Sequence, residues 1–68
     1  MKNRIRVARA ELRMTQQQLA DAAGVSRQTV NAIESGKFVP STLLALKMSR
    51  IFRMAVEDLF QLEEGDMQ

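Results

Sequence analysis

The stretch from residue 27 to residue 31 carries three side chains with the chemistry to recognise base pairs: Arg27, Gln28 and Asn31. Arginine can donate hydrogen bonds to guanine O6 and N7, and glutamine or asparagine can pair with adenine N6 and N7. Residues 27 and 31 are one helical turn apart, so a helix would turn these side chains outward together. Thr29 lies between them and can pack its methyl group against thymine or bind a phosphate. These four residues are candidates for reading DNA.

The residues on which catalysis most often depends are absent. The sequence has no cysteine and no histidine. Without cysteine there is no disulfide, zinc-thiolate site or thiol nucleophile. Without histidine, the commonest general base near neutral pH and the commonest metal ligand are missing. Nothing in the sequence pairs the carboxylates or lysines in a catalytic enclosure, so we expect no enzyme, no metal site and no cofactor.

Charge is divided along the chain. The ten basic and eight acidic residues give a net charge of +2. All ten basic residues lie in residues 1–53 with only three acidic ones, so this part carries +7. Residues 54–68 hold the other five acidic residues and no basic one, which gives −5. The division indicates an anionic partner for the first part and a different role for the end of the chain.

The size and the pattern of apolar residues bound the fold. With 68 residues the chain can form one small domain that buries only about 60% of its unfolded surface. The longest apolar run is residues 43–46, far short of a membrane span, and the basic start lacks the apolar centre of a signal peptide. We expect one domain over residues 1–62, no membrane segment, and a short acidic tail over 63–68 that is frayed from Glu63 onwards.

The spacing of apolar residues predicts helices rather than strands. Five helices are expected at residues 2–13, 16–23, 27–34, 42–53 and 56–61. The expected core positions in the first helix are Ile5, Ala8 and Leu12. In the last two helices they are Leu43, Leu46, Phe52, Val56, Leu59 and Phe60.

Local signals mark where these helices begin and end. Thr15 is a good N-cap, and Gln18 three residues later completes a capping box. Ser26 and Ser41 are the expected N-caps of the third and fourth helices, and Gly24 and Gly36 are suited to helix C-termini. Two short helices joined by residues 24–25 cannot lie in line, so they must cross steeply as a helix-turn-helix.

The 20-residue stretch QQQLADAAGVSRQTVNAIES resembles the helix-turn-helix of the XRE family, the Cro and repressor type of bacteria, archaea and phages. Counted from Gln16, its fifth residue is the small Ala20 and its ninth is Gly24. Apolar residues stand at the fourth, eighth, tenth, fifteenth and eighteenth places: Leu19, Ala23, Val25, Val30 and Ile33. The resemblance extends over about residues 3–60. It implies an all-α, compact five-helix bundle of the lambda-repressor-like DNA-binding type. It also implies a cytoplasmic, nucleoid-associated protein of a prokaryote or a phage.

The resemblance also implies how such a domain would act. It suggests a sequence-specific regulator of transcription, most simply a repressor, that binds double-stranded DNA and inserts the helix beginning at Ser26 into the major groove. The phosphate-binding residues would be Gln16, Gln17, Ser26 and Lys37. Arg9 and Glu34 stand where the family often has a salt bridge between the first and third helices, with solvated charges as the alternative.

A single helix-turn-helix reads only a few base pairs, so a palindromic operator and a homodimer are expected. The resemblance places the interface in the last two helices. Its candidates are Met54, Val56, Phe60 and Leu62, although the same residues fit an intramolecular core equally well. No small-molecule ligand is evident.

Two other functions remain open at this point. The same domain can belong to an antitoxin-like protein whose acidic tail grips a protein partner while the DNA-binding face serves autoregulation, although no extension for such a partner is visible. Binding of RNA or a membrane surface through the basic first helix is weaker, because that helix has too little apolar face for both core and lipid.

Three positions depart from the family pattern. Arg13 and Arg53 stand where glycine is frequent, and a non-glycine residue in the left-handed conformation costs about 1 kcal/mol. Ala55 stands where serine or threonine commonly caps the last helix, and loss of a cap also costs about 1 kcal/mol. These departures should weaken the C-terminal part and leave the recognition surface intact.

Overall fold

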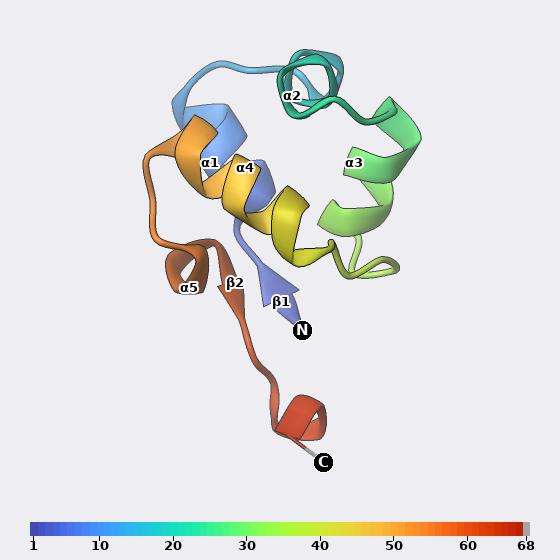
Figure 1. Ribbon diagram of the computed structural model, residues 1–68, viewed down its shortest axis with the longest axis vertical. Coiled ribbons are helices and arrows are strands. Elements are labelled where there is room, and N and C mark those ends of the chain that lie inside the picture. The colour runs from blue at the N-terminus through green and yellow to red at the C-terminus, as the bar shows by residue number, and fades with distance from the viewer. Residues whose placement is uncertain (68) are drawn as a thin grey trace.

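A computed structural model describes residues 1–67 and confirms the all-α architecture expected from the sequence. Helix α4 crosses the middle of the molecule, in front of α1 in this view, with α2 at one end and α3 at the side; the short strand pair lies between the helices and the C-terminal turn at the other end (Figure 1). None of the helices in residues 1–67 is long and apolar enough to cross a membrane. In chain order the elements are β1 (Lys2–Asn3), α1 (Ile5–Glu11), α2 (Gln16–Ala23), α3 (Arg27–Glu34), α4 (Thr42–Phe52), α5 (Val56–Leu59), β2 (Phe60–Gln61) and the 3₁₀ turn Glu64–Met67.

The predicted capping residues hold the helix N-termini in place. The Thr15 hydroxyl accepts from the Gln18 amide at 3.0 Å, and the Gln18 side chain accepts from the Thr15 amide at 2.8 Å, which confirms the capping box. The Ser26 hydroxyl accepts from the Thr29 amide, and the Ser41 hydroxyl from the Leu44 amide, each at 3.1 Å. Each bond satisfies an amide that the first helical turn leaves without a partner.

The turn between α2 and α3 sets their relative direction. Gly24 has the left-handed φ of 74° that ends α2 without the strain a β-carbon would bring. The Val25 amide then donates to the Ala20 carbonyl at 3.0 Å, which closes the end of the helix. The two helices cross steeply (Figure 1), as the helix-turn-helix prediction requires.

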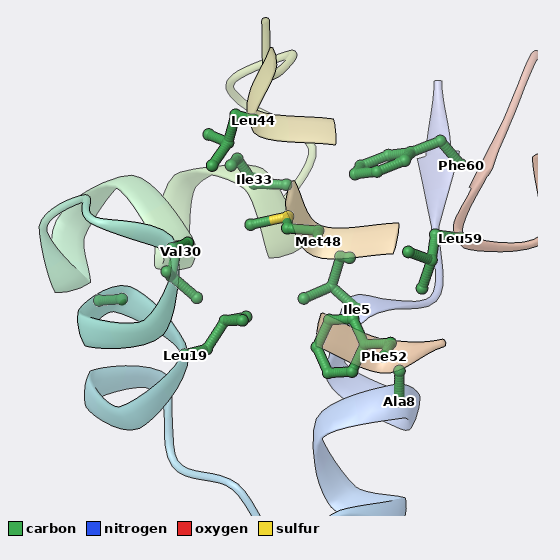
Figure 2. Close-up of a cluster of buried hydrophobic side chains, with 12 residues drawn as sticks. Ile5, Ala8, Leu19, Val30, Ile33, Leu44, Met48, Phe52, Leu59 and Phe60 are labelled. Carbon is green, nitrogen blue, oxygen red and sulfur yellow. The ribbon is translucent and has the colours of Figure 1, made fainter. Parts of the chain in front are cut away.

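One apolar core connects the five helices (Figure 2). Ala20 is completely buried, and its small side chain lets neighbouring elements approach α2 closely. The buried set is Ile5, Ala8, Leu19, Ala20, Ala23, Val30, Ile33, Leu44, Met48, Phe52, Leu59 and Phe60. Removal of these side chains from water is the main term that stabilises so small a domain.

Two helices bury different residues from those expected. Leu43 and Leu46 were predicted to lie in the core, but they are 65% and 56% exposed. The inward face of α4 is instead formed by Leu44, Met48 and Phe52, whose spacing of four residues keeps them on one side of the helix. The prediction for Leu12 was also wrong, because α1 ends at Glu11 and Leu12 is 52% exposed.

The two ends of the chain pair as strands, which the sequence analysis did not predict. Lys2 and Asn3 lie opposite Gln61 and Phe60 in an antiparallel pair. The helices predicted at residues 2–13 and 56–61 are therefore shorter in the structure, Ile5–Glu11 and Val56–Leu59. Residues 2–3 and 60–61 leave the helices because they pair as strands. The Asn3 side chain reinforces this end by donating to the Ile33 carbonyl at 2.8 Å and accepting from the Ile5 amide.

The tail is also more ordered than expected. Residues Glu64–Met67 form a 3₁₀ turn rather than a frayed end. The amino group of Met1 lies 3.0 Å from both Glu63 Oε1 and Asp66 Oδ2. The hydrogen bonds that this amino group donates to Asp66 and Glu63 raise its pKa. The hydrogen bond that the Glu63 amide donates to Asp66 lowers the pKa of that carboxyl group.

The three departures from the family pattern leave visible traces. Arg13 and Arg53 adopt φ values of 53° and 54°, in the left-handed region that favours glycine. Ala55 precedes α5 with an extended backbone and supplies no side-chain hydrogen bond to it. Helix α5 is a single turn of four residues.

Candidate nucleic-acid interface

Helix α3 presents a polar face because its apolar face is fixed in the core. Val30 and Ile33 are almost completely buried. Arg27, Gln28 and Asn31 are exposed, so the predicted base-reading side chains share the outward face. The helix cannot rotate to hide them without exposing Val30 and Ile33 to water.

The first turn of α3 is held by a pair of hydroxyl groups. Ser26 Oγ lies 3.0 Å from Thr29 Oγ1 and accepts from the Thr29 amide. Thr29 is half-buried, so it is less accessible than the other candidate base-reading residues. Ser26 acts here as the N-cap, and its hydroxyl lies at the start of the candidate recognition helix.

Helix α2 begins beside α3 with Gln16 and Gln17. Gln17 is exposed, and its side-chain amide donates to Asp21 Oδ1 at 2.9 Å. The first turn of a helix directs backbone N–H groups and a partial positive charge outward, which suits a phosphate. The Thr15 hydroxyl accepts from the Gln18 backbone amide. The backbone amides of Gln16 and Gln17 are therefore the donors of this turn that remain for a phosphate.

Lys37 lies just beyond the end of α3. Gly36 turns the chain with a φ of 78°, and the Lys37 amide donates to the Ala32 carbonyl at 2.9 Å. The backbone at Lys37 is therefore fixed while its side chain is exposed. The Lys37 side chain is therefore available to a ligand beside the end of α3.

An ion pair joins α1 to the end of α3. Arg9 Nε lies 2.7 Å from Glu34 Oε2, and Arg9 Nη2 lies 3.2 Å from Oε1, so the pair is bidentate. Arg9 also donates to the Met14 carbonyl at 2.8 Å. The pair thus ties the end of α1 and the loop before α2 to the last turn of α3.

The environment of Glu34 keeps it ionised. Its side chain has no exposed surface. Burial by itself raises the pKa of Glu34, but hydrogen bonds from Arg9, Gln16 and Arg6 outweigh burial and hold the pKa below its ordinary value. The same carboxylate raises the pKa of Arg9. Glu34 is therefore a fixed, charged acceptor behind the candidate interface.

The sequence analysis missed a hydrogen-bond network around this carboxylate. Gln16 Nε2 lies 3.2 Å from Glu34 Oε1 and 3.4 Å from Asn31 Oδ1. Arg6 Nε lies 3.4 Å from the same Glu34 oxygen. The network brings together a predicted phosphate contact, a predicted base reader and the ion pair. The resemblance had implied only the contact of Arg9 with Glu34, because the contacts from Arg6 and Gln16 depend on how α1 and α2 pack against α3.

The candidate dimer residues lie in different environments. Phe60 is buried in the core, and Met54 and Val56 are partly buried against it, which fits the intramolecular alternative. Leu62 is 64% exposed. Val39, Leu43 and Leu46 are also exposed and are here called the α4 apolar surface. Val39 and Leu46 line one shallow groove, of about 380 Å³, and Leu43 and Leu46 line another.

Comparisons with known proteins agree on one family. A family model described as Helix-turn-helix matches residues 5–59. An uncharacterized HTH-type transcriptional regulator of Bacillus subtilis, YgzD, is 52% identical over 64 residues, which cover 94% of this chain and 97% of that protein. An uncharacterized HTH-type transcriptional regulator of Methanocaldococcus jannaschii is 46% identical over 66 residues, which cover 97% of this chain and 100% of that protein.

A solved structure has a similar fold. The restriction-modification controller protein C.AhdI from Aeromonas hydrophila matches with a TM-score of 0.76 and 28% identity, over 84% of this chain and 86% of that one. The match covers most of both chains, so the similarity includes more than the two helices of the motif.

Proposed function

Because the chain belongs to the XRE-type helix-turn-helix family of transcriptional regulators, we propose that it reads a specific sequence in the major groove of double-stranded DNA with α3. The observation that carries this proposal is the fixed polar face of α3. Val30 and Ile33 are held in the core, which leaves Arg27, Gln28 and Asn31 exposed on the helix that would enter the groove.

The residues divide into two roles. Arg27, Gln28, Thr29 and Asn31 contact base edges, which specifies the sequence. Phosphates are bound by the start of α2, the start of α3 and the loop after α3, which positions the helix on the duplex. The residues for these phosphate contacts are Gln16, Gln17, Ser26 and Lys37.

The distribution of charge supports this orientation. Residues 1–53 carry +7 and include the start of α2, all of α3 and Lys37. The tail, with Glu63, Glu64 and Asp66, lies at the end of the molecule opposite α2 (Figure 1). The acidic end of the chain therefore does not have to approach the phosphates.

A homodimer on a palindromic operator completes the proposal. Two copies must place their α3 helices one turn of B-DNA apart, about 34 Å. Each copy measures 34 × 22 × 20 Å, and the pair needs a shared face that sets the spacing of the two α3 helices. The α4 apolar surface offers such a face, and Leu62 is a further exposed apolar side chain. A dimer that covers a promoter would act as a repressor.

In-vitro selection from random duplex DNA tests the proposal. We expect enrichment of a palindrome whose half-sites are centred about 10 base pairs apart. The matched control changes Arg27, Gln28 and Asn31 together to alanine while Val30 and Ile33 remain, so the fold is kept and enrichment is lost. Equal affinity of the unchanged protein for selected and random duplexes would contradict sequence-specific reading.

A further inference from the structure

We infer that Asn3 is a positioning residue for DNA binding: it fixes the turn that follows α3, so that Lys37 is held in place to bind a backbone phosphate. The inference rests on the proposed function, in which Lys37 makes that phosphate contact. It deepens the proposed function, because it makes the strand pair formed by the two ends of the chain part of the DNA-binding machinery.

The turn after α3 leads the chain out of the core to Lys37. The Gly36 amide donates to the Ile33 carbonyl at 3.0 Å. The Lys37 amide donates to the Ala32 carbonyl at 2.9 Å, and the two bonds together form a Schellman motif. Residues 35–37 are exposed, so no side chain of the turn anchors it in the core. The position of Lys37 therefore depends on the carbonyl groups to which the turn is bonded.

Asn3 supplies a second bond to one of these carbonyl groups. Its side-chain Nδ2 donates to the Ile33 carbonyl at 2.8 Å. A carbonyl oxygen has two lone pairs, so this oxygen accepts from Asn3 and from Gly36 together. Within residues 1–67, no other side chain from outside α3 and its turn bonds to the backbone of residues 31–37. Asn3 is thus the external anchor of this backbone.

A shallow groove lies between β1 and the end of α3. Its volume is about 360 Å³, and its lining includes Lys2, Asn3, Ser35 and Gly36. Because the groove is open, close packing of side chains does not fix the distance between β1 and the turn. The hydrogen bond from Asn3 provides the fixed link between them.

Asn3 itself is held by groups that do not belong to α3. Its Oδ1 accepts from the Ile5 amide at 3.2 Å, and its backbone pairs with Phe60 of β2. The amide of the next residue, Arg4, donates to the Leu59 carbonyl at 2.8 Å. These bonds fix Asn3 to the start of α1 and to the C-terminal strand. The turn after α3 is therefore tied to a fixed point of the fold.

A fixed turn strengthens a phosphate contact because binding has to order every group that makes it. A long side chain such as lysine already loses rotamer freedom when it is immobilised at an interface. With the Asn3 bond in place, only the side chain of Lys37 has to be ordered. Without this bond the backbone of the turn has to be ordered as well, which costs further conformational entropy. Loss of the bond should therefore weaken the contact of Lys37 and leave the base preferences of α3 unchanged.

The experiment measures the effect of K37A with and without the Asn3 bond. N3D keeps an acceptor for the Ile5 amide and removes the donor to Ile33. N3S also keeps an acceptor, and its uncharged side chain is too short to reach Ile33. In the unchanged protein, K37A should weaken binding to the selected operator by on the order of 10-fold at about 0.1 M salt, because one phosphate contact is lost. In N3D and N3S we expect K37A to weaken binding by about 2-fold or less.

The two Asn3 variants should also show the loss by themselves. Each should reduce the slope of log affinity against log salt by nearly one, as K37A does, since the same phosphate contact is weakened. A residue that only stabilised the fold would lower the temperature of unfolding without changing this slope. Affinities are therefore measured well below the unfolding temperature of each variant.

The control is Q61A, in the other strand of the pair. Gln61 lies opposite Lys2, and its side chain donates to the carbonyls of Glu57 and Asp58 and not to α3. Q61A should reduce thermal stability and leave the effect of K37A at its full size. The control thus separates a weaker strand pair from loss of the bond to Ile33.

The outcomes separate this inference from the proposed function. A full effect of K37A in both N3D and N3S would overturn the inference and leave the proposed function intact. An unchanged salt slope of K37A in the otherwise unchanged protein would remove Lys37 from the phosphate contacts, and the inference with it. Failure to enrich any duplex would overturn the proposed function itself.

Discussion

At the scale of single residues, Glu34 links the stability of the domain to its candidate interface. It receives hydrogen bonds from Arg6, Arg9 and Gln16. It also lies one turn beyond Asn31 on α3. The resemblance to the family implied the contact with Arg9. The contacts from Arg6 and Gln16 could not be predicted, because they depend on how α1 and α2 are placed against α3, which no local pattern records.

The pH dependence of stability should reflect Glu34. Its pKa is lower in the folded state than the ordinary value of 4.5, so the unfolded chain takes up a proton first as pH falls. The contribution of Glu34 to the free energy of unfolding is therefore complete above about pH 4.5. It is lost as the pH falls through the pKa of Glu34 in the folded state. Urea unfolding at pH 7 and pH 3 measures this loss.

The variant E34Q separates this residue from the other carboxylates. It should be less stable at pH 7 by about 1–3 kcal/mol, because charge-assisted hydrogen bonds are replaced by neutral ones. It should also lose less stability between pH 7 and pH 3 than the unchanged protein. The control E57Q alters an exposed carboxylate of α5 and should keep the original pH dependence. If E34Q lost as much stability between pH 7 and pH 3 as the unchanged protein, Glu34 would not be a source of the pH dependence.

Arg27 and Lys37 should respond differently to truncation. If Arg27 donates to a guanine, R27A costs about 1–3 kcal/mol on the selected operator and relaxes the preference at one base pair. K37A should weaken all duplexes alike and reduce the slope of log affinity against log salt by about one. Titrations at several salt concentrations distinguish the two. Similar effects of both variants on every duplex would argue against base contact by Arg27.

At the scale of secondary-structure elements, prediction succeeded where the signal was local. Thr15, Ser26 and Ser41 cap the helices that follow them, because a cap depends on residues within one turn. The inward face of α4 was predicted only in part: Phe52 is buried as expected, but Leu43 and Leu46 are exposed. Its sequence is apolar on more than one side, and only packing against the rest of the core distinguishes Leu44 from Leu43.

The end of α4 offers a test of backbone strain. Arg53 has a φ of 54°, so R53G should stabilise the domain by up to about 1 kcal/mol by removing the left-handed strain. Arg50 is in the last turn of the same helix, and R50G should destabilise it by about 1 kcal/mol, since glycine disfavours a helix interior. Thermal unfolding compares the two. The same sign for both substitutions would contradict this account.

At the scale of the whole molecule, the α4 apolar surface is the feature that an isolated domain leaves unexplained; it joins two exposed leucines of α4 to a valine of the loop before that helix. Leu43, Leu46 and Val39 are each more than half exposed. Such an apolar area on so small a protein is typical of an interface. The sequence analysis did not predict this surface, because leucines at helical spacing are equally typical of a buried helix face.

Dimer formation through the α4 apolar surface should make binding to a palindrome cooperative. We expect two protomers per selected duplex, with the second bound more tightly than the first. The variant L46E should bind the half-sites independently, because a carboxylate in an apolar interface is costly. The control V7E places the same charge at an exposed apolar position of α1. Sedimentation on duplex DNA measures the cooperativity, and its persistence in L46E would exclude this interface.

The pairing of β1 with β2 has a consequence for how the chain folds. Most contacts of the helices are local, whereas Asn3 and Phe60 meet across nearly the whole sequence. Contacts so far apart are slow to form from an open chain. Next to the strands, the Arg4 backbone amide donates to the Leu59 carbonyl at 2.8 Å, so packing of α1 against α5 brings the two strands together. We expect the strand pair to form after the transition state of folding. Its main kinetic effect is then to slow unfolding.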